Sequence, residues 1–255
     1  KRGQSGKPQI NFTANMYVNT PRNKVGVLDG DQFRQVITDY YGEGSPAYNL
    51  LGTANTNWQD EILRTSVSSD YNLSVGGTYK ILPYRVAVSY TNQNGILKTS
   101  AMDRVTASIT LNPKFFDNTL SVTANVKGFY MHNRFADEGA IGGAVSFDPS
   151  QSVRVDNLPI GNGYFTWLKP GTDEFIGIAP VNPVSLIDER SMKADVYRSV
   201  GNLQLDYVMP FLPALHANLN LGYDVSHSIQ HNLMTPDSPL TYKENKKKGL
   251  GQDER

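Results

Sequence analysis

A strict alternation of apolar and polar residues over positions 10–19 constrains the fold of this chain more than any other feature. Ile10, Phe12 and Val18 stand at even positions, and the odd positions carry polar side chains or Tyr17. Side chains of an extended strand point alternately to its two faces, so this segment has one apolar face and one polar face. Such a strand fits either a sandwich with a closed apolar core or a transmembrane barrel whose apolar face meets lipid.

The same alternation recurs along the chain and predicts an all-β fold of about seven strands. The further segments are 67–75, 84–91, 105–112, 120–127, 203–209 and 215–225. Turn signals separate several of them, among them Asn94-Gly95, Asn112-Pro113 and the prolines Pro210 and Pro213. Asn-Gly favours tight turns, and proline cannot donate a hydrogen bond to a β-ladder, so these positions mark the ends of strands.

Composition excludes several classes of protein. The chain has 255 residues, with 24 Lys and Arg against 24 Asp and Glu, and this balance gives no sign of a nucleic-acid partner. No segment approaches the ~18 to 20 consecutive apolar residues of a membrane helix. A β-barrel is still allowed, because only alternate residues of each strand touch lipid. The absence of cysteine excludes disulfides and thiolate metal sites.

The lengths of the connections favour the barrel over the sandwich. Tight links follow the second, fourth and sixth predicted strands, whereas long loops at about 20–66 and 131–198 follow the first and fifth. An outer-membrane barrel sorts its loops in this way, with short periplasmic turns and long extracellular loops. The polar faces also carry mostly uncharged groups such as Thr13, Ser108 and Asn125, which suit a wetted lumen. We therefore predict an antiparallel transmembrane β-barrel segment whose long loops contain short helices.

An odd number of strands cannot close a bacterial single-chain barrel, which has an even count. The chain opens on Lys1-Arg2-Gly3 and ends in the charged run 243–248. We expect additional sequence before Lys1 and further strands after Arg255.

The long loops contain the candidate ligand-facing residues. Asp29 and the apolar spacing from Phe33 to Tyr41 predict an amphipathic helix that Gly42 ends, and 55–63 predicts a further helical turn. The apolar stripe of the first helix is expected to pack against the rest of its loop. In the second loop, flat aromatic rings stand beside amide and carboxyl groups, a combination that binds sugar rings. The predicted substrate-binding residues are Asn162, Tyr164, Trp167 and Asp173. The alternative is that these rings pin the loop onto the barrel.

No pattern in the sequence predicts catalysis, a metal site or a bound cofactor. Of the four histidines, His227 and His231 alone have an i,i+4 spacing, and their segment does not have the pattern of a helix. Asp137-Glu138 and Asp188-Glu189 have no neighbouring base or nucleophile pattern and are expected to be solvated loop acids. Nucleophile-elbow and phosphate-loop motifs are also absent from the sequence. We therefore do not expect an enzyme.

Several ordered motifs resemble the SusC/RagA family of TonB-dependent outer-membrane transporters, over nearly the whole chain. The matching residues are Lys1-Arg2-Gly3 with Ser5-Gly6-Lys7-Pro8, Asn55-Thr56-Asn57-Trp58-Gln59-Asp60-Glu61, Tyr71-Asn72-Leu73-Ser74-Val75-Gly76-Gly77, Tyr90-Thr91-Asn92-Gln93-Asn94-Gly95-Ile96-Leu97, Arg104, Asn112-Pro113, Asn133-Arg134-Phe135 and Phe147-Asp148-Pro149.

The resemblance implies a barrel of about 22 strands with a plugged lumen. Residues 1–9 would be the end of the plug and its linker, and 10–255 the N-terminal part of the barrel, roughly its first third. The family implies import of oligosaccharides or peptides across the bacterial outer membrane, a SusD-like surface lipoprotein as lid, and coupling to the TonB complex through parts of the family pattern that this sequence lacks. It implies no bound nucleotide.

Two hypotheses follow. The first is a wall segment of a nutrient-importing barrel, in which Ile10, Val75, Val88, Val122 and Leu219 face lipid. The alternative is a secreted adhesin or carbohydrate-binding β-sandwich without transport activity, in which those side chains lie in a closed core.

Overall fold

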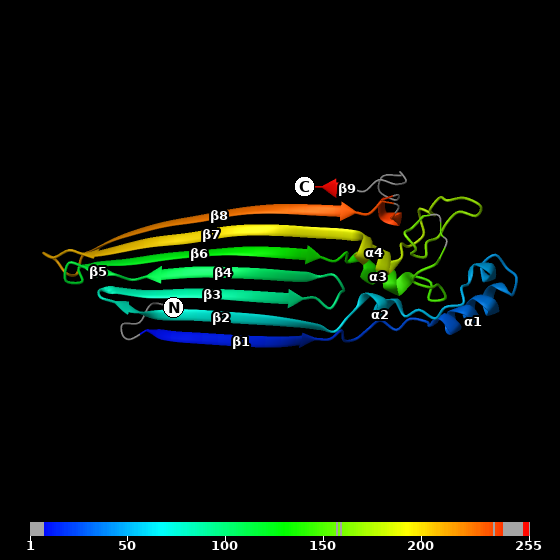
Figure 1. Cartoon of the computed structure of the whole chain (residues 1–255), viewed down its shortest axis with the longest axis horizontal. Helices are drawn as coiled ribbons and strands as arrows, with labels where there is room; N and C mark the ends of the chain where they lie inside the picture. Colours follow the sequence, from blue (N-terminus) through cyan, green and yellow to red (C-terminus); the bar gives the residue numbers. More distant parts are fainter. Residues whose placement is uncertain (1–7, 157, 159, 237, 242–251, 255) are drawn as a thin grey trace.

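The chain folds into one long antiparallel sheet with helices at one end (Figure 1). This computed structural model describes residues 8–156, 158, 160–236, 238–241 and 252–254. The strands follow in the order β1-β2-β3-β4-β6-β7-β8-β9, with β5 paired to β6. Their bounds are β1 Gln9–Asn19, β2 Ser66–Tyr79, β3 Leu82–Asn94, β4 Ala101–Leu111, β5 Lys114–Phe115, β6 Leu120–Phe135, β7 Arg190–Val208, β8 His216–Met234 and β9 Gln252–Glu254.

The seven predicted strands correspond to β1 to β4 and β6 to β8, which confirms the all-β prediction. The second long loop is shorter than predicted, because β6 continues to Phe135 and β7 begins at Arg190. In these extensions the residues on the side of the apolar face become polar, as at His132, Arg134 and Asp195, whereas Met131 and Met192 stand on the opposite face. The alternation that identified the strands is therefore lost there. The predicted end of the plug at 1–9 lies largely outside the described residues, as does the charged run 243–248.

The helices all lie in the connections at one end of the sheet, which we call the loop end (Figure 1). The first long loop holds α1 Gly30–Tyr41, a 3-10 turn η1 Tyr48–Leu50 and α2 Trp58–Ile62, and the second holds α3 Gly139–Ser146 and α4 Pro183–Glu189. At the other end, the turn end, the links are 80–81, 112–119 and 209–215. The sorting of long and short connections to opposite ends is thus confirmed. None of the described helices is long and apolar enough to cross a bilayer.

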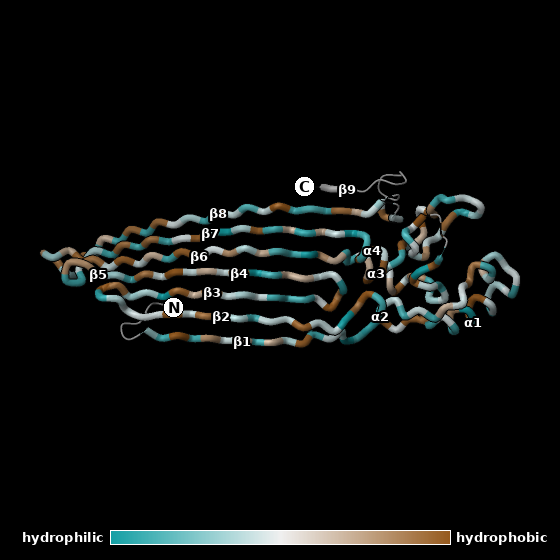
Figure 2. Tube along the Cα trace, viewed as in Figure 1, coloured by the Kyte–Doolittle hydropathy of each residue, from teal (hydrophilic) through white to brown (hydrophobic). Residues whose placement is uncertain are grey.

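The register gathers the apolar residues of all the long strands onto one face of the sheet, which we call the apolar face. Directly paired residues share a face, so a row can be followed from strand to strand. One such row runs through Ile10, Val75, Val86, Ile109, Val126, Gly201 and Tyr223. The intervening rows carry Asn, Ser and Thr, and Figure 2 shows the resulting alternation of brown and teal along the strands.

No described part of the chain forms a layer over the apolar face. Among the described residues the strands form a single sheet, and no second sheet packs against it. Ile10 is 71%, Val88 47% and Leu219 50% exposed, and Val75 and Val122 are half-buried. Folding buries apolar side chains when it can, so an extended apolar face of this size must be covered by something outside the described fold.

Candidate functional site

The two long loops are joined along segments 50–58 and 148–151. The amide of Ala54 donates to the carbonyl of Ser150 and that of Thr56 to the carbonyl of Pro149, both at 2.9 Å. The indole Nε1 of Trp58 donates to the carbonyl of Asp148 at 3.0 Å. The motifs Asn55–Glu61 and Phe147–Pro149, far apart in the sequence, therefore meet in this loop junction.

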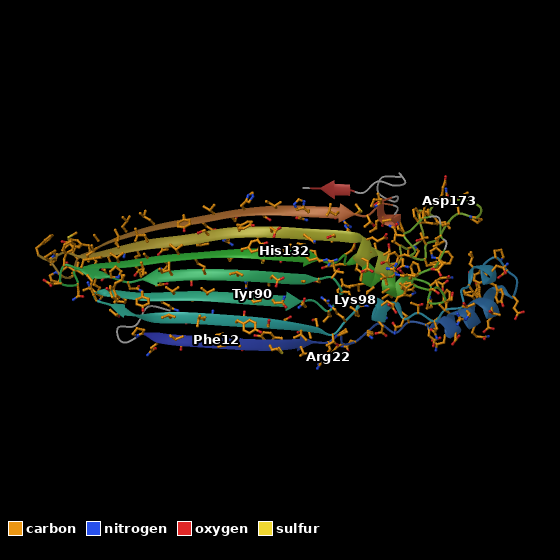
Figure 3. All side chains as sticks on the ribbon, in the orientation of Figure 1. Phe12, Arg22, Tyr90, Lys98, His132 and Asp173 are labelled. Carbon is orange, nitrogen blue, oxygen red and sulfur yellow. The ribbon has the colours of Figure 1, made fainter. Side chains whose placement is uncertain are left out.

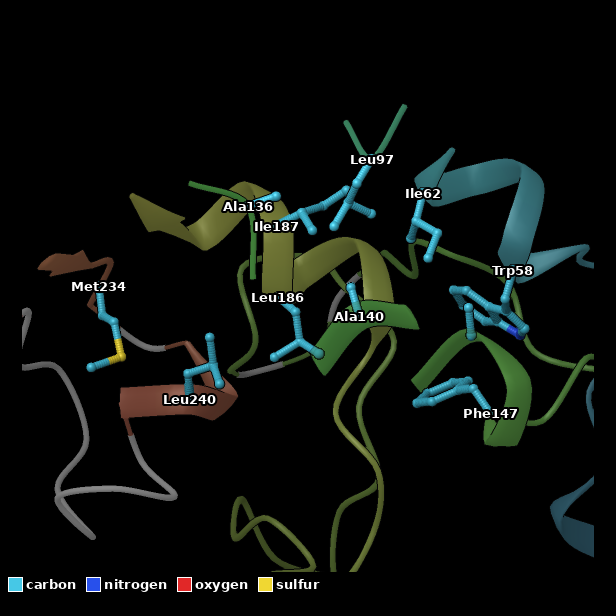
Figure 4. Close-up of a cluster of buried hydrophobic side chains, with 11 residues drawn as sticks. Trp58, Ile62, Leu97, Ala136, Ala140, Phe147, Leu186, Ile187, Met234 and Leu240 are labelled. Atoms are coloured by element: carbon cyan, nitrogen blue, oxygen red, sulfur yellow. The ribbon is translucent and has the colours of Figure 1, made fainter. Parts of the chain in front are cut away.

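Buried apolar side chains stabilise the loop junction (Figure 4). Trp58 is 2% and Phe147 3% exposed, and their ring centroids lie 4.7 Å apart in an edge-on arrangement. Ile62 of α2 and Ile187 of α4 are also fully buried in this cluster. Since the cluster draws on both loops and on four short helices or turns, it holds the loop end as one packed unit.

Helix α1 forms as predicted and its apolar stripe is only partly covered. Asp29 caps it, accepting from the amide of Gln32 at 2.8 Å, and Gly42 at φ 82° ends it. Within the stripe, Phe33 and Ile37 are half-buried, whereas Tyr40 is 81% exposed. Val36 and Tyr41 are exposed as well, at 49% and 56%. The expected packing against the loop therefore holds for one half of the stripe only.

A cavity of about 850 Å³ lies between α1 and the second loop. Its lining includes Phe33, Ile37, Leu50, Trp58, Phe147 and Trp167. This volume and the aromatic lining are typical of sites that bind small molecules or single residues of a larger ligand. Phe33, Leu50 and Phe147 are not among the residues that the sequence predicts to face a ligand. Trp58 stood in a recognised motif, but the meeting of the two loops was not visible from the sequence.

Of the four predicted ligand-facing residues, only Trp167 lines this cavity. Trp167 also borders a second cavity of about 480 Å³ with Phe175 and Pro180. Asp173 is exposed near the tip of the second loop (Figure 3).

Tyr164 and Asn162 are instead engaged within the loop. Tyr164 is 4% exposed, and its hydroxyl donates to Asp188 Oδ2 at 2.7 Å and accepts from Arg154. Burial, together with this bond to Asp188, raises the pKa of Tyr164 well above its ordinary value, so the hydroxyl stays protonated. Asn162 donates from Nδ2 to the carbonyl of Pro236 at 2.8 Å and to Glu189. These contacts match the alternative in which the loop residues hold the loop in place.

The apolar face is bounded on its loop side by a row of tyrosines. Register pairs Tyr71 with Tyr90 and, across Val105, continues to Tyr130 and Tyr197. The rings of Tyr130 and Tyr197 have centroids 4.9 Å apart. Tyrosine rings gather at membrane interfaces because one end of the side chain is apolar and the other end takes hydrogen bonds.

The tyrosine hydroxyls point away from the apolar residues and toward acids nearer the loops. Tyr90 donates to Asp103 Oδ1 at 2.7 Å, and Tyr130 donates to Asp195 Oδ1 at 2.6 Å. Charged carboxylates need water or strong hydrogen bonds, so the acids mark the beginning of the polar zone on this face. Figure 3 shows Tyr90 and His132, two members of this boundary, on neighbouring parts of the sheet.

A second set of aromatic residues stands at the turn end and completes the apolar band. Tyr79 is 67%, Phe116 74% and Phe211 80% exposed. Between Tyr71 and Tyr79, eight residues of strand span roughly 27 Å before any tilt. That is close to the ~25 Å apolar band, flanked by aromatic girdles, that barrels present to the outer membrane.

Among the residues that the structure describes, no group of three or more His, Cys, Asp or Glu side chains is placed to hold a metal ion. His227 and His231 lie on strand β8, where an i,i+4 spacing separates them by about 13 Å.

One sheet with an aromatic-bounded apolar face and large loops at one end defines the wall of an outer-membrane-type β-barrel. No family model matches the chain. It is 36% identical over 250 residues to the TonB-dependent receptor SusC of Bacteroides thetaiotaomicron. The aligned region covers 93% of this chain and 25% of SusC. It is 28% identical over 212 residues to the TonB-dependent receptor P3 of Formosa agariphila, covering 78% of this chain and 19% of that protein.

Solved structures give the same fold. The RagAB peptide transporter matches with a TM-score of 0.73 at 13% identity, over 94% of this chain and 30% of that chain. The RagAB peptide importer in its open-open state matches with a TM-score of 0.72 at 16% identity, over 99% and 31% respectively. The chain is a SusC/RagA-like part of a TonB-dependent receptor, and it spans about a quarter of the length of SusC.

Proposed function

We propose that this chain forms part of the wall of a TonB-dependent importer in the bacterial outer membrane, a multi-pass barrel that takes up oligosaccharides or peptides. The observation that carries this proposal is the apolar face bounded by tyrosines, in a chain 36% identical to SusC over 93% of its length. In this reading, residues 1–9 end the plug and 10–255 form the N-terminal part of the barrel. The chain contributes to transport and has no catalytic role.

The loop end is the side on which we place a SusD-like lipoprotein lid. Tyr40 and Tyr41 of α1 project from the first loop with 81% and 56% exposure, beside the exposed Val36. Exposed aromatic clusters of this kind mark protein interaction surfaces. The TonB complex would act from the opposite, periplasmic side, through parts of the receptor other than this wall.

Substrate is proposed to contact the loop end beside the cavity of about 850 Å³. Asn162, Tyr164, Trp167 and Asp173 remain the proposed ligand-facing set, and the geometry favours Trp167 within it. Its ring borders both loop cavities and offers a flat apolar surface to a sugar ring or to a peptide side chain.

Uptake of labelled oligosaccharides and of labelled peptides by cells that make the full-length receptor tests the proposal. We expect accumulation of one of the two classes, lost when TonB is deleted. Accumulation that does not depend on TonB, or a receptor found in the soluble fraction, would contradict an outer-membrane importer.

In the same uptake assay, Trp167→Ala should reduce transport at low substrate concentration about tenfold, because stacking contributes ~1 kcal/mol or more per aromatic contact. Ile178→Ala is the matched control. Ile178 lies in the same loop, is 97% exposed and lines neither cavity, so uptake should change little. Equal losses in the two variants would contradict a stacking role for Trp167.

Lipid contact predicts a strong asymmetry between the two faces of β6. Val126 lies in the central apolar row and is 44% exposed, so Val126→Arg would place a charge near the middle of the bilayer. The barrel should lose about 2 to 4 kcal/mol of folding free energy in lipid vesicles. Asn125→Arg, on the polar face one residue away, should cost much less. Comparable losses measured by denaturant titration would indicate that the apolar face does not meet lipid.

The secreted β-sandwich alternative has less support. It requires a second sheet over the apolar face, and the described strands form only one.

A further inference from the structure

Two basic residues are paired across β6 and β7 on the same side of the sheet as the apolar face. They lie between the tyrosine row and the loop end. Register pairs Arg134 of β6 with Lys193 of β7, and His231 of β8 follows next to Lys193. Arg134 shares its parity with Tyr130, and Lys193 with Tyr197, so these side chains project from the same face as the tyrosines. Four residues of strand place the basic pair about 13 Å nearer the loops than the tyrosine rings.

The charges of this pair are not compensated within the described fold. Among the described residues, neither Arg134 nor Lys193 forms an ion pair, and the Nε of Arg134 is buried without a hydrogen-bond acceptor. The acids of the intervening row are engaged elsewhere. Asp103 accepts from Tyr90 and Asn92, and Asp195 from Tyr130, with His132 bonded to it through Nδ1.

Like charges directly opposite each other in a sheet are destabilising, and a buried donor without an acceptor adds to this cost. An anion lying between the two side chains would remove both costs. Arginine presents a planar fork of donors that matches two phosphate oxygens, and lysine adds a point charge. The chemistry at this position therefore suits a phosphate group.

We propose that Arg134 and Lys193 bind the phosphate group of a lipid in the outer leaflet of the membrane. This inference rests on the proposed function, because it requires the apolar face to meet lipid. The tyrosine row lies at the edge of the apolar band. A strand tilt of about 45° reduces the distance from this row to the basic pair to roughly 9 Å along the membrane normal, and the two long side chains can reach back to the depth of the lipid phosphates. The paired His132 and Asp195 lie between the basic pair and the stacked rings of Tyr130 and Tyr197.

Native mass spectrometry of the full-length receptor tests the inference. The receptor is released from detergent micelles that contain either phosphatidic acid or uncharged diacylglycerol, and the retained lipid is counted. The double variant Arg134→Gln/Lys193→Gln should bind phosphatidic acid about tenfold or more weakly, since it removes both charged donors to the phosphate. Binding of diacylglycerol should not change.

Arg104→Gln/Lys127→Gln is the matched control, because it removes the same two charges from the opposite, polar face of β4 and β6. Phosphatidic acid binding should match the unmodified receptor. Unchanged binding in the Arg134/Lys193 variant, or an equal loss in the control, overturns the inference.

Inorganic phosphate distinguishes a lipid site from a site for free anions. Phosphatidic acid should stay bound in millimolar phosphate, since its acyl chains add apolar contacts, and complete displacement would overturn the lipid assignment. A receptor that does not insert into lipid vesicles at all would contradict the proposed function itself. A receptor that inserts but shows no difference between the two double variants contradicts only the phosphate site.

Discussion

Replacing Gly52 by valine should separate the two long loops. A Cβ atom at this position would lie 2.2 Å from the carbonyl oxygen of Ser150, closer than any non-bonded contact allows. Because that oxygen belongs to the backbone, the neighbouring strand of the loop junction has to move away. The move breaks the bond from the Gly52 amide to Ser150 Oγ and the bond from the Ala54 amide to the Ser150 carbonyl, each 2.9 Å long.

The expected loss is about 3 kcal/mol or more in the free energy of opening the junction, which combines steric overlap with the lost hydrogen bonds. Hydrogen exchange of the full-length receptor measures this quantity directly. The amides of Ala54 and Thr56 should exchange about a hundredfold faster in Gly52→Val, since each 1.4 kcal/mol is a factor of ten.

Gly142→Ala supplies the control for this measurement. A Cβ at Gly142, inside helix α3, meets no atom within 4 Å. Alanine there should leave exchange in segment 50–58 unchanged and stabilise the helix slightly. If Gly52→Val also left exchange at 54 and 56 unchanged, the close approach of the two loops would be wrong.

The central parts of the strands could be predicted from the sequence because the two faces of the sheet differ in polarity there, and every residue faces one or the other. Each residue of β1 faces either the apolar side or the polar side, so the alternation at 10–19 is visible in one segment. Helix α1 was also predictable, since its cap at Asp29 and its stop at Gly42 depend on local contacts.

The outer parts of β6 and β7 could not be predicted in the same way. Beyond the tyrosine row the side of the apolar face becomes polar, as at the paired His132 and Asp195, while the paired Met131 and Val196 stand on the opposite face. The alternation of the central strand is therefore not continued, and the pattern that marks the strand ends there. Hydrogen bonds between β6 and β7 extend β6 to Phe135 and start β7 at Arg190. These bonds join segments that are distant in the sequence.

The choice among the four predicted ligand-facing residues depends on packing that the sequence does not show. Tyr164 and Trp167 are both aromatic residues beside polar groups, so the sequence pattern does not distinguish them. In the structure the ring of Tyr164 is buried and its hydroxyl bonds to Asp188, whereas Trp167 borders a cavity. The residue type shows that a ring can bind a sugar. Only the packing of the second loop decides which ring is available to do so.

Replacing Glu189 by alanine should open the second long loop and the segment after β8 together. Glu189 ends helix α4, is 5% exposed, and its carboxyl group accepts from four side chains of different segments. The donors are Asn162, Ser185, Thr235 and Ser238. The sequence predicts a solvated loop acid at this position, and that prediction is wrong: three of the four donors come from segments distant in the chain, and the carboxyl group is buried among them.

Truncation of Glu189 leaves several buried donors without an acceptor, and each such group costs about 1 to 3 kcal/mol. We therefore expect Glu189→Ala to lower the free energy of local opening by at least about 3 kcal/mol, with faster exchange at both Asn162 and Thr235. The free energy of local opening in Glu189→Gln should lie between those of the unmodified receptor and Glu189→Ala. The glutamine amide retains one acceptor oxygen but turns an N–H donor toward the other hydroxyl groups.

Glu174→Ala is the matched control within the same loop. Glu174 is exposed and pairs with Lys169 at 2.7 Å, a contact that lowers the pKa of the carboxyl group. Exposed ion pairs contribute little to stability, so exchange at Asn162 and Thr235 should not change. Should Glu189→Ala behave like Glu174→Ala, the carboxyl group of Glu189 would not be what joins α4 to these two segments, and the loop end would depend on its apolar cluster alone.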